Sequence, residues 1–223
     1  MAKVAIIFYS QTGTTYELAK AVAEGASEAG AETRLLKVKE TAPDEVWTGN
    51  ENWKKHREEI EHLKEATNDD LEWADAIIFG TPTRYGLPAA QLKNFIDQTG
   101  ALWAKGALTN KIGSSFTSTA TAHGGQEATI LSLNTIFYHW NMLIVAPGYA
   151  DPIQFQAGNP YGVSFTSQNG AASPDEFARQ LAAQGVTSAL EVGPGSVLCG
   201  LLRAIDPSMR TARFGEASDA ALA

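Results

Sequence analysis

The sequence predicts an α/β fold built around a parallel sheet, and two features of the chain indicate it. Short apolar runs of strand length alternate with segments whose apolar residues recur every three or four positions, the spacing of a helix. No tight hairpin joins one apolar run to the next, and parallel strands require helical crossovers. The first run, within residues 3–9 (KVAIIFY), is apolar without alternation, so we expect a central strand with helices on both faces.

The remaining elements follow in order along the chain. Leu18, Val22, Ala26 and Ala29 form one apolar stripe on the first helix, and Gly30 is placed to end it. The next strand alternates as an edge strand does. The expected strands beyond the first lie within residues 32–39, 74–86, 111–125 and 141–150, and the later helices over residues 88–103 and 126–140.

The composition limits the partners that the protein takes. Its 223 residues suffice for one compact domain, and the formal net charge of −8 argues against nucleic acid or an anionic membrane as the main partner. Because Cys199 is the single cysteine, the chain can form neither an internal disulfide nor a four-thiolate zinc site. A chain without disulfides suits the reducing cytoplasm, where we expect the protein. His56 and His62 lie six positions apart and share no helical face, so we expect no metal. No apolar run approaches the roughly 20 residues of a membrane helix.

Two parts of the chain depart from the alternating pattern. Residues 47–70 are dense in mixed charge, with a thin apolar stripe at Trp53, Ile60 and Leu63, which predicts a solvated surface helix inserted into the fold. Residues 151–177 are loop-like, except that a capping box starting at Ser173 predicts a helix to about residue 190. We therefore expect one domain over residues 1–190 and a tail of uncertain order over residues 191–223.

Three polar loops each follow the carboxyl end of an expected buried strand. They are residues 10–15, 81–86 and 117–125. In open α/β sheets, ligands bind in the crevice outside these ends, where the strand order reverses. One polar loop there would be ordinary, but three together predict a single site.

The first of these loops, residues 10–15 (SQTGTT), has the chemistry of an anion site. It opens a helix, whose first backbone N–H groups lack partners within the helix and whose dipole favours negative charge. Four hydroxyl groups add donors, Gly13 lets the main chain approach a ligand closely, and no Lys or Arg is present. Such a loop suits an enclosed monophosphate. A hydroxyl-rich helix cap that binds nothing explains the segment equally well.

Two other kinds of phosphate site are excluded because the chain lacks their sequence motifs. A P-loop needs GxxxxGK[ST], and no Gly-Lys pair followed by Ser or Thr occurs. The dinucleotide fingerprint GxGxxG is absent after the first strand, and residues 193–200 (GPGSVLCG) break it at Leu198.

Several separate motifs resemble one known family. SQTGTT directly after a first strand is similar to the FMN-phosphate loop of flavodoxin-like proteins. FGTPTRYG, FIDQTGALWAKGAL, FTSTATAHGGQE and PYG are similar, in the same order, to segments of WrbA-type NAD(P)H:quinone oxidoreductases. The resemblance covers residues 1–162. It implies a flavodoxin-like, doubly wound open sheet of about five parallel strands in the order 2-1-3-4-5.

The resemblance also implies FMN as the cofactor and the residues that hold it. The first loop would take the phosphate, and main-chain groups of the second would bond the polar edge of the flavin ring. The implied FMN-binding residues are Ser10, Gln11, Thr12, Gly13, Thr14, Thr15, Thr83, Arg84, Tyr85, Ser118, Thr119, Ala120, Thr121, Ala122, His123, Gly124, Gly125 and His139. Arg84, the only cation of the second loop, would favour an electron-rich reduced flavin or bond the backbone.

The family's substrate-site aromatic matches Trp103, and its flavin-site histidine matches His139. From the residues alone, Trp103 is as well explained as a core or interface residue, and His139 as a structural one. No acid–base residue is assigned. Gln11 and Thr12 stand where the family commonly has an aromatic residue or Met, and the tail beyond residue 193 is unlike the family.

The function that the resemblance implies is two-electron reduction of quinones by hydride exchange at FMN, in protection from oxidative stress. NADH or NADPH would be the donor, and a homodimer or homotetramer would place active sites at subunit boundaries. Two alternatives stay open: an electron-transfer flavodoxin, which the acidic charge fits, and a flavin-binding regulatory protein. A receiver domain is set aside, because it needs an acidic pair where this chain has Ser10, Gln11 and Thr12.

Overall fold

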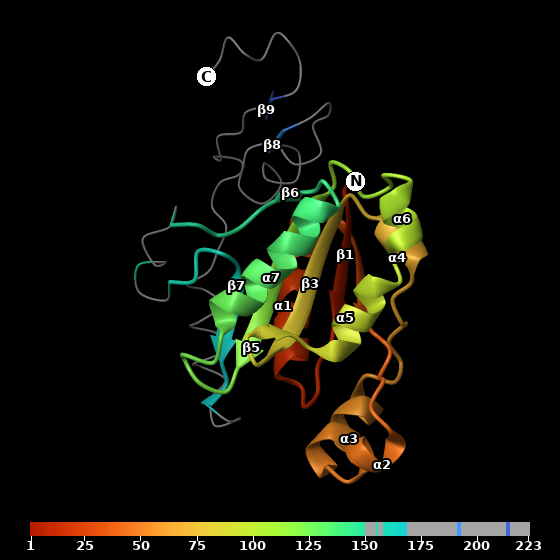
Figure 1. Ribbon diagram of the computed structural model, residues 1–223, viewed down its shortest axis with the longest axis vertical. Helices are drawn as coiled ribbons and strands as arrows, with labels where there is room; N and C mark the ends of the chain where they lie inside the picture. Colours follow the sequence, from red (N-terminus) through yellow and green to blue (C-terminus); the bar gives the residue numbers. More distant parts are fainter. Residues whose placement is uncertain (150–154, 156–157, 169–190, 193–212, 215–223) are drawn as a thin grey trace.

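Five parallel strands form the centre of the fold, in the order β2-β1-β3-β5-β6 (Figure 1). The computed structural model describes residues 1–149, 155, 158–168, 191–192 and 213–214. Counted along the chain, this is the predicted order 2-1-3-4-5, which is confirmed. The strands are β1 (Lys3–Phe8), β2 (Glu32–Lys37), β3 (Ala76–Arg84), β5 (Ile112–Thr119) and β6 (Leu143–Ile144).

Two more short strands extend this sheet. β4 (Leu87–Pro88) runs antiparallel to β3, and β7 (Val163–Thr166) runs parallel to β5. β6 pairs only with the start of β5, at Ile112 and Gly113, whereas β7 pairs with its carboxyl half. The expectation of a loop over residues 151–177 is therefore wrong at 163–166. β7 forms because the carboxyl half of β5 needs a hydrogen-bonding partner that β6 does not supply, and it buries Phe165.

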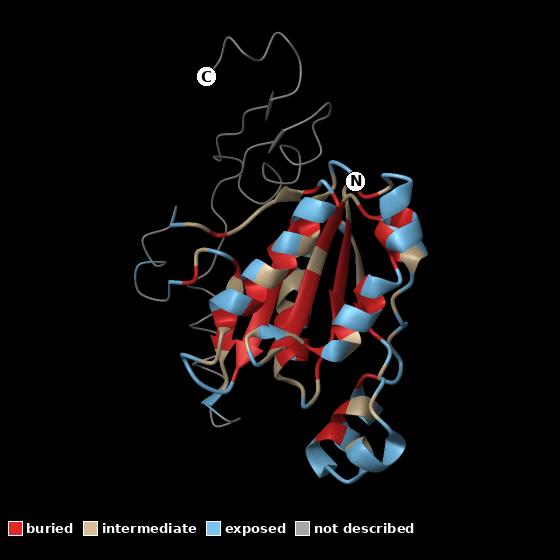
Figure 2. Cartoon of the chain, in the orientation of Figure 1, coloured by how far each residue is buried: buried red, intermediate tan, exposed pale blue. Residues whose placement is uncertain are grey.

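Helices cover both faces of the sheet, as the apolar first strand predicts (Figure 2). α1 (Thr14–Glu28) packs on the face to which Ile6 and Phe8 point, and it ends just before Gly30. Ile7 points to the other face, since successive side chains of a strand alternate. That face is covered by α4 (Asn68–Trp73), α5 (Ala90–Asp97), α6 (Gly100–Ala104) and α7 (Gln126–His139).

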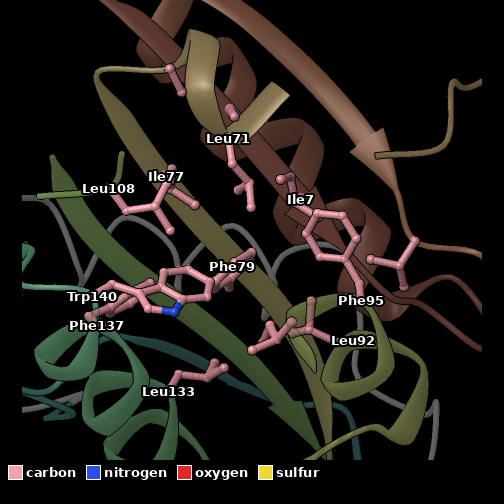
Figure 3. Close-up of a cluster of buried hydrophobic side chains, with 14 of the residues drawn as sticks. Ile7, Leu71, Ile77, Phe79, Leu92, Phe95, Leu108, Leu133, Phe137 and Trp140 are labelled. Carbon is pink, nitrogen blue, oxygen red and sulfur yellow. The ribbon is translucent and has the colours of Figure 1, made fainter. Parts of the chain in front are cut away.

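Figure 3 shows the core on this second face. The rings of Phe79 and Phe137 stack at 5.6 Å, and Trp140 meets both edge-on. Gly113 of β5 leaves the space for Phe137, because a Cβ atom there would lie 2.8 Å from the ring. These contacts fix α7 against β3 and β5, the two strands that carry the second and third polar loops.

The charged insertion forms two short helices rather than one. They are α2 (Asp44–Thr48) and α3 (Glu51–Glu59), and they stand at the carboxyl edge of the sheet beside the first loop (Figure 1). Trp53 and Ile60 are buried, as their spacing predicts. The interpretation of this run as a solvated face is wrong at His56, which is only 3% exposed. His56 lies three residues after Trp53, on the same face of α3, and its ring packs 5.6 Å from that of Tyr16 in α1.

Beyond β7, the structure describes only a few residues of the chain. The helix predicted from Ser173 to about residue 190 lies outside the described residues. Of the tail, the structure describes β8 (Glu191–Val192) and β9 (Arg213–Phe214), which pair in parallel. Among the described residues, no helix has the length and apolar character needed to cross a membrane.

Candidate functional site

The three polar loops meet in one cleft at the carboxyl edge of the sheet. The cleft has a volume of about 230 Å³. Its lining comes from the ends of β1, β3, β5 and β7, and consists of Ser10, Gln11, Thr12, Thr14, Thr15, Pro82, Thr83, Arg84, Ser118, Thr119, Ala120 and Ser167. Sequence reasoning missed Ser167, because it follows the unpredicted strand β7. Its backbone N–H donates to the carbonyl of Thr119 at 2.8 Å, which joins that strand to the third loop.

The first loop leaves the start of α1 open. Gly13 is the N-cap residue with φ 107°, a conformation that favours glycine, and no described side chain caps the helix. Within the loop, the N–H of Gly13 donates to Ser10 Oγ at 3.2 Å. Thr15 is buried, and its hydroxyl lies 2.9 Å from that of Ser118 in β5. The uncapped start of α1 therefore borders the cleft, on a loop that is tied to the end of β5, across β3 from β1.

The second loop is held in place by α7. Tyr85 has φ 54° and Gly86 φ 80°, so the chain turns sharply after β3 and leaves the Tyr85 side chain fully exposed. Thr83 Oγ1 accepts from the N–H of Gly86 at 3.2 Å and lies 2.8 Å from the hydroxyl of the buried Thr129 in α7. Gly125, just before α7, approaches so closely that a Cβ atom there would lie 2.8 Å from Gly86 Cα.

Arg84 joins the second loop to the first. Its Nη1 donates to the carbonyl of Thr83 at 2.9 Å, and its Nη2 donates to Gln11 Oε1. A bond to the backbone, one of the two roles expected for Arg84, is thus present, and Gln11 is an additional partner. Among the described residues that line the cleft, Arg84 is the only charged one. The cleft otherwise offers neutral hydroxyl and backbone donors.

The third loop is ordered by internal hydrogen bonds. Thr119 Oγ1 donates to the carbonyl of Thr121 at 2.8 Å, and Gln126 Nε2 donates to Thr119 Oγ1 at 2.8 Å. A Cβ atom at Gly124 would lie 2.9 Å from Thr119 Cβ, so glycine permits the close return of the chain. Thr121, Ala122 and His123 are exposed and are not part of the cleft lining.

Trp103 and His139 lie together, but away from the cleft. Trp103 Nε1 donates to the carbonyl of His139 at 3.0 Å, and both side chains are exposed. α6 and the end of α7 precede β5 and β6, so these residues stand at the amino edge of the sheet, opposite the three loops (Figure 1). The structure therefore does not gather Trp103, His139 and Tyr85 around one cleft within a single chain.

Glu40 links α3 of the charged insertion to the sheet by hydrogen bonds, beside the cleft. Its Oε2 accepts from Tyr9 Oη at 3.1 Å and from Trp53 Nε1 at 3.2 Å, and its Oε1 accepts from Gln91 Nε2 at 2.7 Å and from the next two backbone N–H groups. Burial works to raise the pKa of Glu40, but these hydrogen bonds outweigh it and hold the pKa below its usual range. Burial and the same carboxylate raise the pKa of Tyr9 far above its usual value.

Glu40→Gln should lower the free energy of unfolding at pH 7 by about 2–3 kcal/mol, because a new NH₂ group would face buried donors. A carboxyl whose folded pKa is lowered stabilises the fold above its unfolded pKa and loses that contribution as the pH falls through the folded value. The difference between wild type and variant should therefore shrink below about pH 4.3. Urea unfolding at several pH values measures it. Glu58→Gln, on an exposed position of α3, is the control, and equal stability of wild type and Glu40→Gln at pH 7 would contradict the argument.

Comparison with known sequences identifies a family and close relatives of this chain. Residues 2–155 match the family model described as NADPH-dependent FMN reductase. The NAD(P)H dehydrogenase (quinone) of Deinococcus radiodurans is 48% identical over 166 residues, covering 74% of this chain and 83% of the relative. That of Aromatoleum aromaticum is 49% identical over 168 residues, covering 73% and 81%.

Solved structures agree on the fold. The flavodoxin, WrbA-like protein from Agrobacterium tumefaciens superposes with a TM-score of 0.55 at 24% identity, covering 83% of this chain and 95% of that one. The flavodoxin of Fusobacterium nucleatum, bound to flavin mononucleotide, superposes with a TM-score of 0.52 at 15% identity, covering 82% and 95%. These likenesses confirm the flavodoxin-like α/β fold. With the match over residues 2–155 and relatives of such identity, the chain belongs to the NADPH-dependent FMN reductase family.

Proposed function

We propose that the protein is an FMN-dependent NAD(P)H:quinone oxidoreductase of the WrbA type. The observation that carries the proposal is the uncapped start of α1, held among three hydroxyl-rich loops at the carboxyl edge of the sheet. Curated relatives that are 48% and 49% identical to this chain over 166 and 168 aligned residues bear the name NAD(P)H dehydrogenase (quinone). A hydroxyl-rich cap that binds nothing does not account for a cleft built from four strand ends.

The first loop fits the phosphate of FMN. The N–H groups of the first turn of α1 would donate to it, aided by the helix dipole and by hydroxyls of Ser10, Thr12 and Thr14. No carboxylate is among the described residues of the lining, so nothing there repels an anion. The bond between Thr15 and Ser118 keeps the loop in shape before the ligand arrives.

The second loop fits the polar edge of the flavin ring. Its main chain is held from behind by Thr129 and Gly125, so its groups are positioned without the ligand. When bound, FMN supplies the redox chemistry, taking a hydride from NADH or NADPH and passing two electrons to a quinone. Arg84 contributes one positive charge to the cleft, which favours ligands that carry or gain negative charge.

Thr129→Val should weaken FMN binding about fivefold. The variant loses the hydrogen bond that holds Thr83 in place, so about 1 kcal/mol of the binding free energy must be spent on ordering the second loop. Thr129→Ser retains the hydroxyl and should bind as the wild type does. Thr135→Val is the matched control on α7, since Thr135 is exposed and its bond among the described residues runs within the helix, to the carbonyl of Leu131. Quenching of flavin fluorescence measures the affinities. Equal weakening by both valine variants would show that the Thr83 bond is not the cause.

A second copy of the chain completes the quinone site in this proposal. A flat quinone needs an apolar stacking surface, and the cleft lining is mostly polar. Trp103 and Tyr138 are large exposed aromatic residues at the opposite edge, 59% and 71% exposed, beside His139. A homodimer or homotetramer would bring this edge of one copy to the cleft of another. Sedimentation at assay concentrations tests the assembly, and a fully active monomer would contradict it.

The function itself is tested with flavin-free protein. Titration with FMN should quench flavin fluorescence at one site per chain, and the loaded protein should then oxidise NADH or NADPH with 1,4-benzoquinone as acceptor. An electron carrier would bind FMN and show almost no steady-state turnover. A protein that does not bind FMN would refute both functions. The ratio of kcat/KM for the two nicotinamide donors identifies the preferred one.

A further inference from the structure

His56 is a buried histidine beside the first loop that the site described above leaves unused. Its side chain is 2% exposed, and the ring packs 5.6 Å from Tyr16, in the first turn of α1. A Cβ atom built on Gly13 would lie 3.7 Å from His56 Nδ1, so the imidazole stands directly behind the loop. The insertion thus places a titratable ring next to the proposed phosphate site.

The hydrogen bonds of His56 define its tautomer. Nδ1 lies 2.9 Å from Glu59 Oε2, and an ionised carboxylate only accepts, so Nδ1 carries the hydrogen. Nε2 is buried and has no hydrogen-bond partner among the described residues. A proton can therefore be added at Nε2 without breaking an existing bond, and Glu59 would stabilise the resulting cation.

Charged groups lie on both helices that pack around the ring. On its own helix, Glu59 faces it. On α1, Tyr16 contacts it, and Lys20 lies 4.9 Å above the Tyr16 ring while pairing with Glu17 at 2.8 Å. The loop itself has no Lys or Arg. Arg57 of α3 and Lys37 of β2 line a pocket together with Ser10, where Arg57 pairs with Glu40 at 3.6 Å and Lys37 donates to the carbonyls of Ile60 and Glu61. A positive charge gained by His56 would add to theirs beside a phosphate dianion bound at residues 10–15.

We propose that His56 takes up a proton from solvent when the phosphate of FMN enters residues 10–15, so that FMN binding is linked to pH through the insertion. The inference rests on the proposed function, in which this loop holds that phosphate. The imidazolium and the dianion attract each other, and the burial of the ring reduces the screening of its charge by water. Binding of one then favours binding of the other by the same factor.

The test compares wild type with His56→Gln across the range from about pH 8.5 to about pH 5.5, which spans the protonation of an imidazole. The FMN dissociation constant of His56→Gln divided by that of the wild type should rise about five- to tenfold as the pH falls, because only the wild type gains the imidazolium. The phosphate of free FMN also titrates near pH 6, and because this step is the same in both titrations, the ratio removes it. His62→Gln, an exposed histidine of the same segment, should follow the wild type.

Two further measurements keep the test decisive. Riboflavin lacks the phosphate, so wild type and His56→Gln should bind it with a ratio that does not change with pH. His56→Phe retains a ring against Tyr16, and it replaces His56→Gln if the latter unfolds. Calorimetry of FMN binding in buffers of different ionisation enthalpy should show more proton uptake by wild type than by either variant.

The possible results distinguish failure of the proposed role of His56 from failure of the proposed function. Parallel pH profiles for FMN, an equal effect in His62→Gln, or the same pH-dependent ratio with riboflavin would overturn the role of His56. In each of these cases FMN still binds, so the proposed function stands. Failure of the wild type to bind FMN at any pH would instead refute the proposed function.

Discussion

Thr14→Asp is expected to weaken FMN binding about 100-fold while leaving the fold at least as stable as the wild type. Thr14 is the first residue of α1 and lines the cleft, so the new carboxylate would stand beside the bound phosphate. The same charge interacts favourably with the N-terminal end of the helix dipole, worth about 0.3–1 kcal/mol. Fluorescence titration with FMN and thermal unfolding of the free protein measure the two effects, which have opposite signs.

Two comparisons assign the loss to charge. Thr14→Asn has nearly the shape of the aspartate without its charge and should lose much less affinity. Riboflavin should bind to Thr14→Asp about as well as to the wild type, because it brings no phosphate to the first loop. If FMN affinity were unchanged in Thr14→Asp, the phosphate would lie elsewhere, and the proposed orientation of FMN in the cleft would be wrong.

Gly80→Ala should lower the free energy of unfolding by about 3 kcal/mol, and the variant should be recovered largely as insoluble protein. Gly80 lies in β3, opposite Phe116 of β5, and both are buried. A Cβ atom at Gly80 would lie 2.1 Å from Phe116 Cζ and 2.3 Å from Cε2, so the ring would have to leave its position. The carbonyl of Gly80 also accepts from the N–H of Tyr9 at 2.9 Å, so the displacement reaches the start of the first loop.

Gly25→Ala is the matched control for that prediction. Gly25 is exposed within α1, and a Cβ atom there would meet nothing within 4 Å. Alanine should stabilise the helix by about 0.5–1 kcal/mol, because it loses less backbone freedom on folding. Denaturant unfolding of both variants measures the contrast. A Gly80→Ala protein as stable as the wild type would mean that Phe116 repacks without cost.

Much of the fold follows from local sequence patterns. The consecutive apolar residues of β1 indicate burial on both faces, and the spacing of Leu18 and Val22 indicates a helix. Because parallel strands present their carboxyl ends at one edge, the three polar loops were expected to meet, and the cleft joins residues from all of them. These patterns act over short stretches or follow from strand direction, so they can be found in the chain itself.

Other features depend on partners distant in the sequence. β7 has no distinctive pattern of its own and forms because β5 offers it an edge about 50 residues away. His56 lies in a charged run and is buried only because α3 settles on α1. Glu40 gains its partners only when Tyr9, Trp53 and Gln91 converge on it from three distant parts of the chain.

The sequence by itself determined the class of fold and the edge at which the polar loops gather, and its resemblance to flavodoxin-like proteins implied the order of the strands. Only the tertiary structure decided that Trp103 and His139 stand at the opposite edge and that the insertion sets a histidine behind the first loop. The physical reason is that periodicity reports which face of an element is buried. It does not report which other element buries that face, because that choice depends on how all the elements pack together.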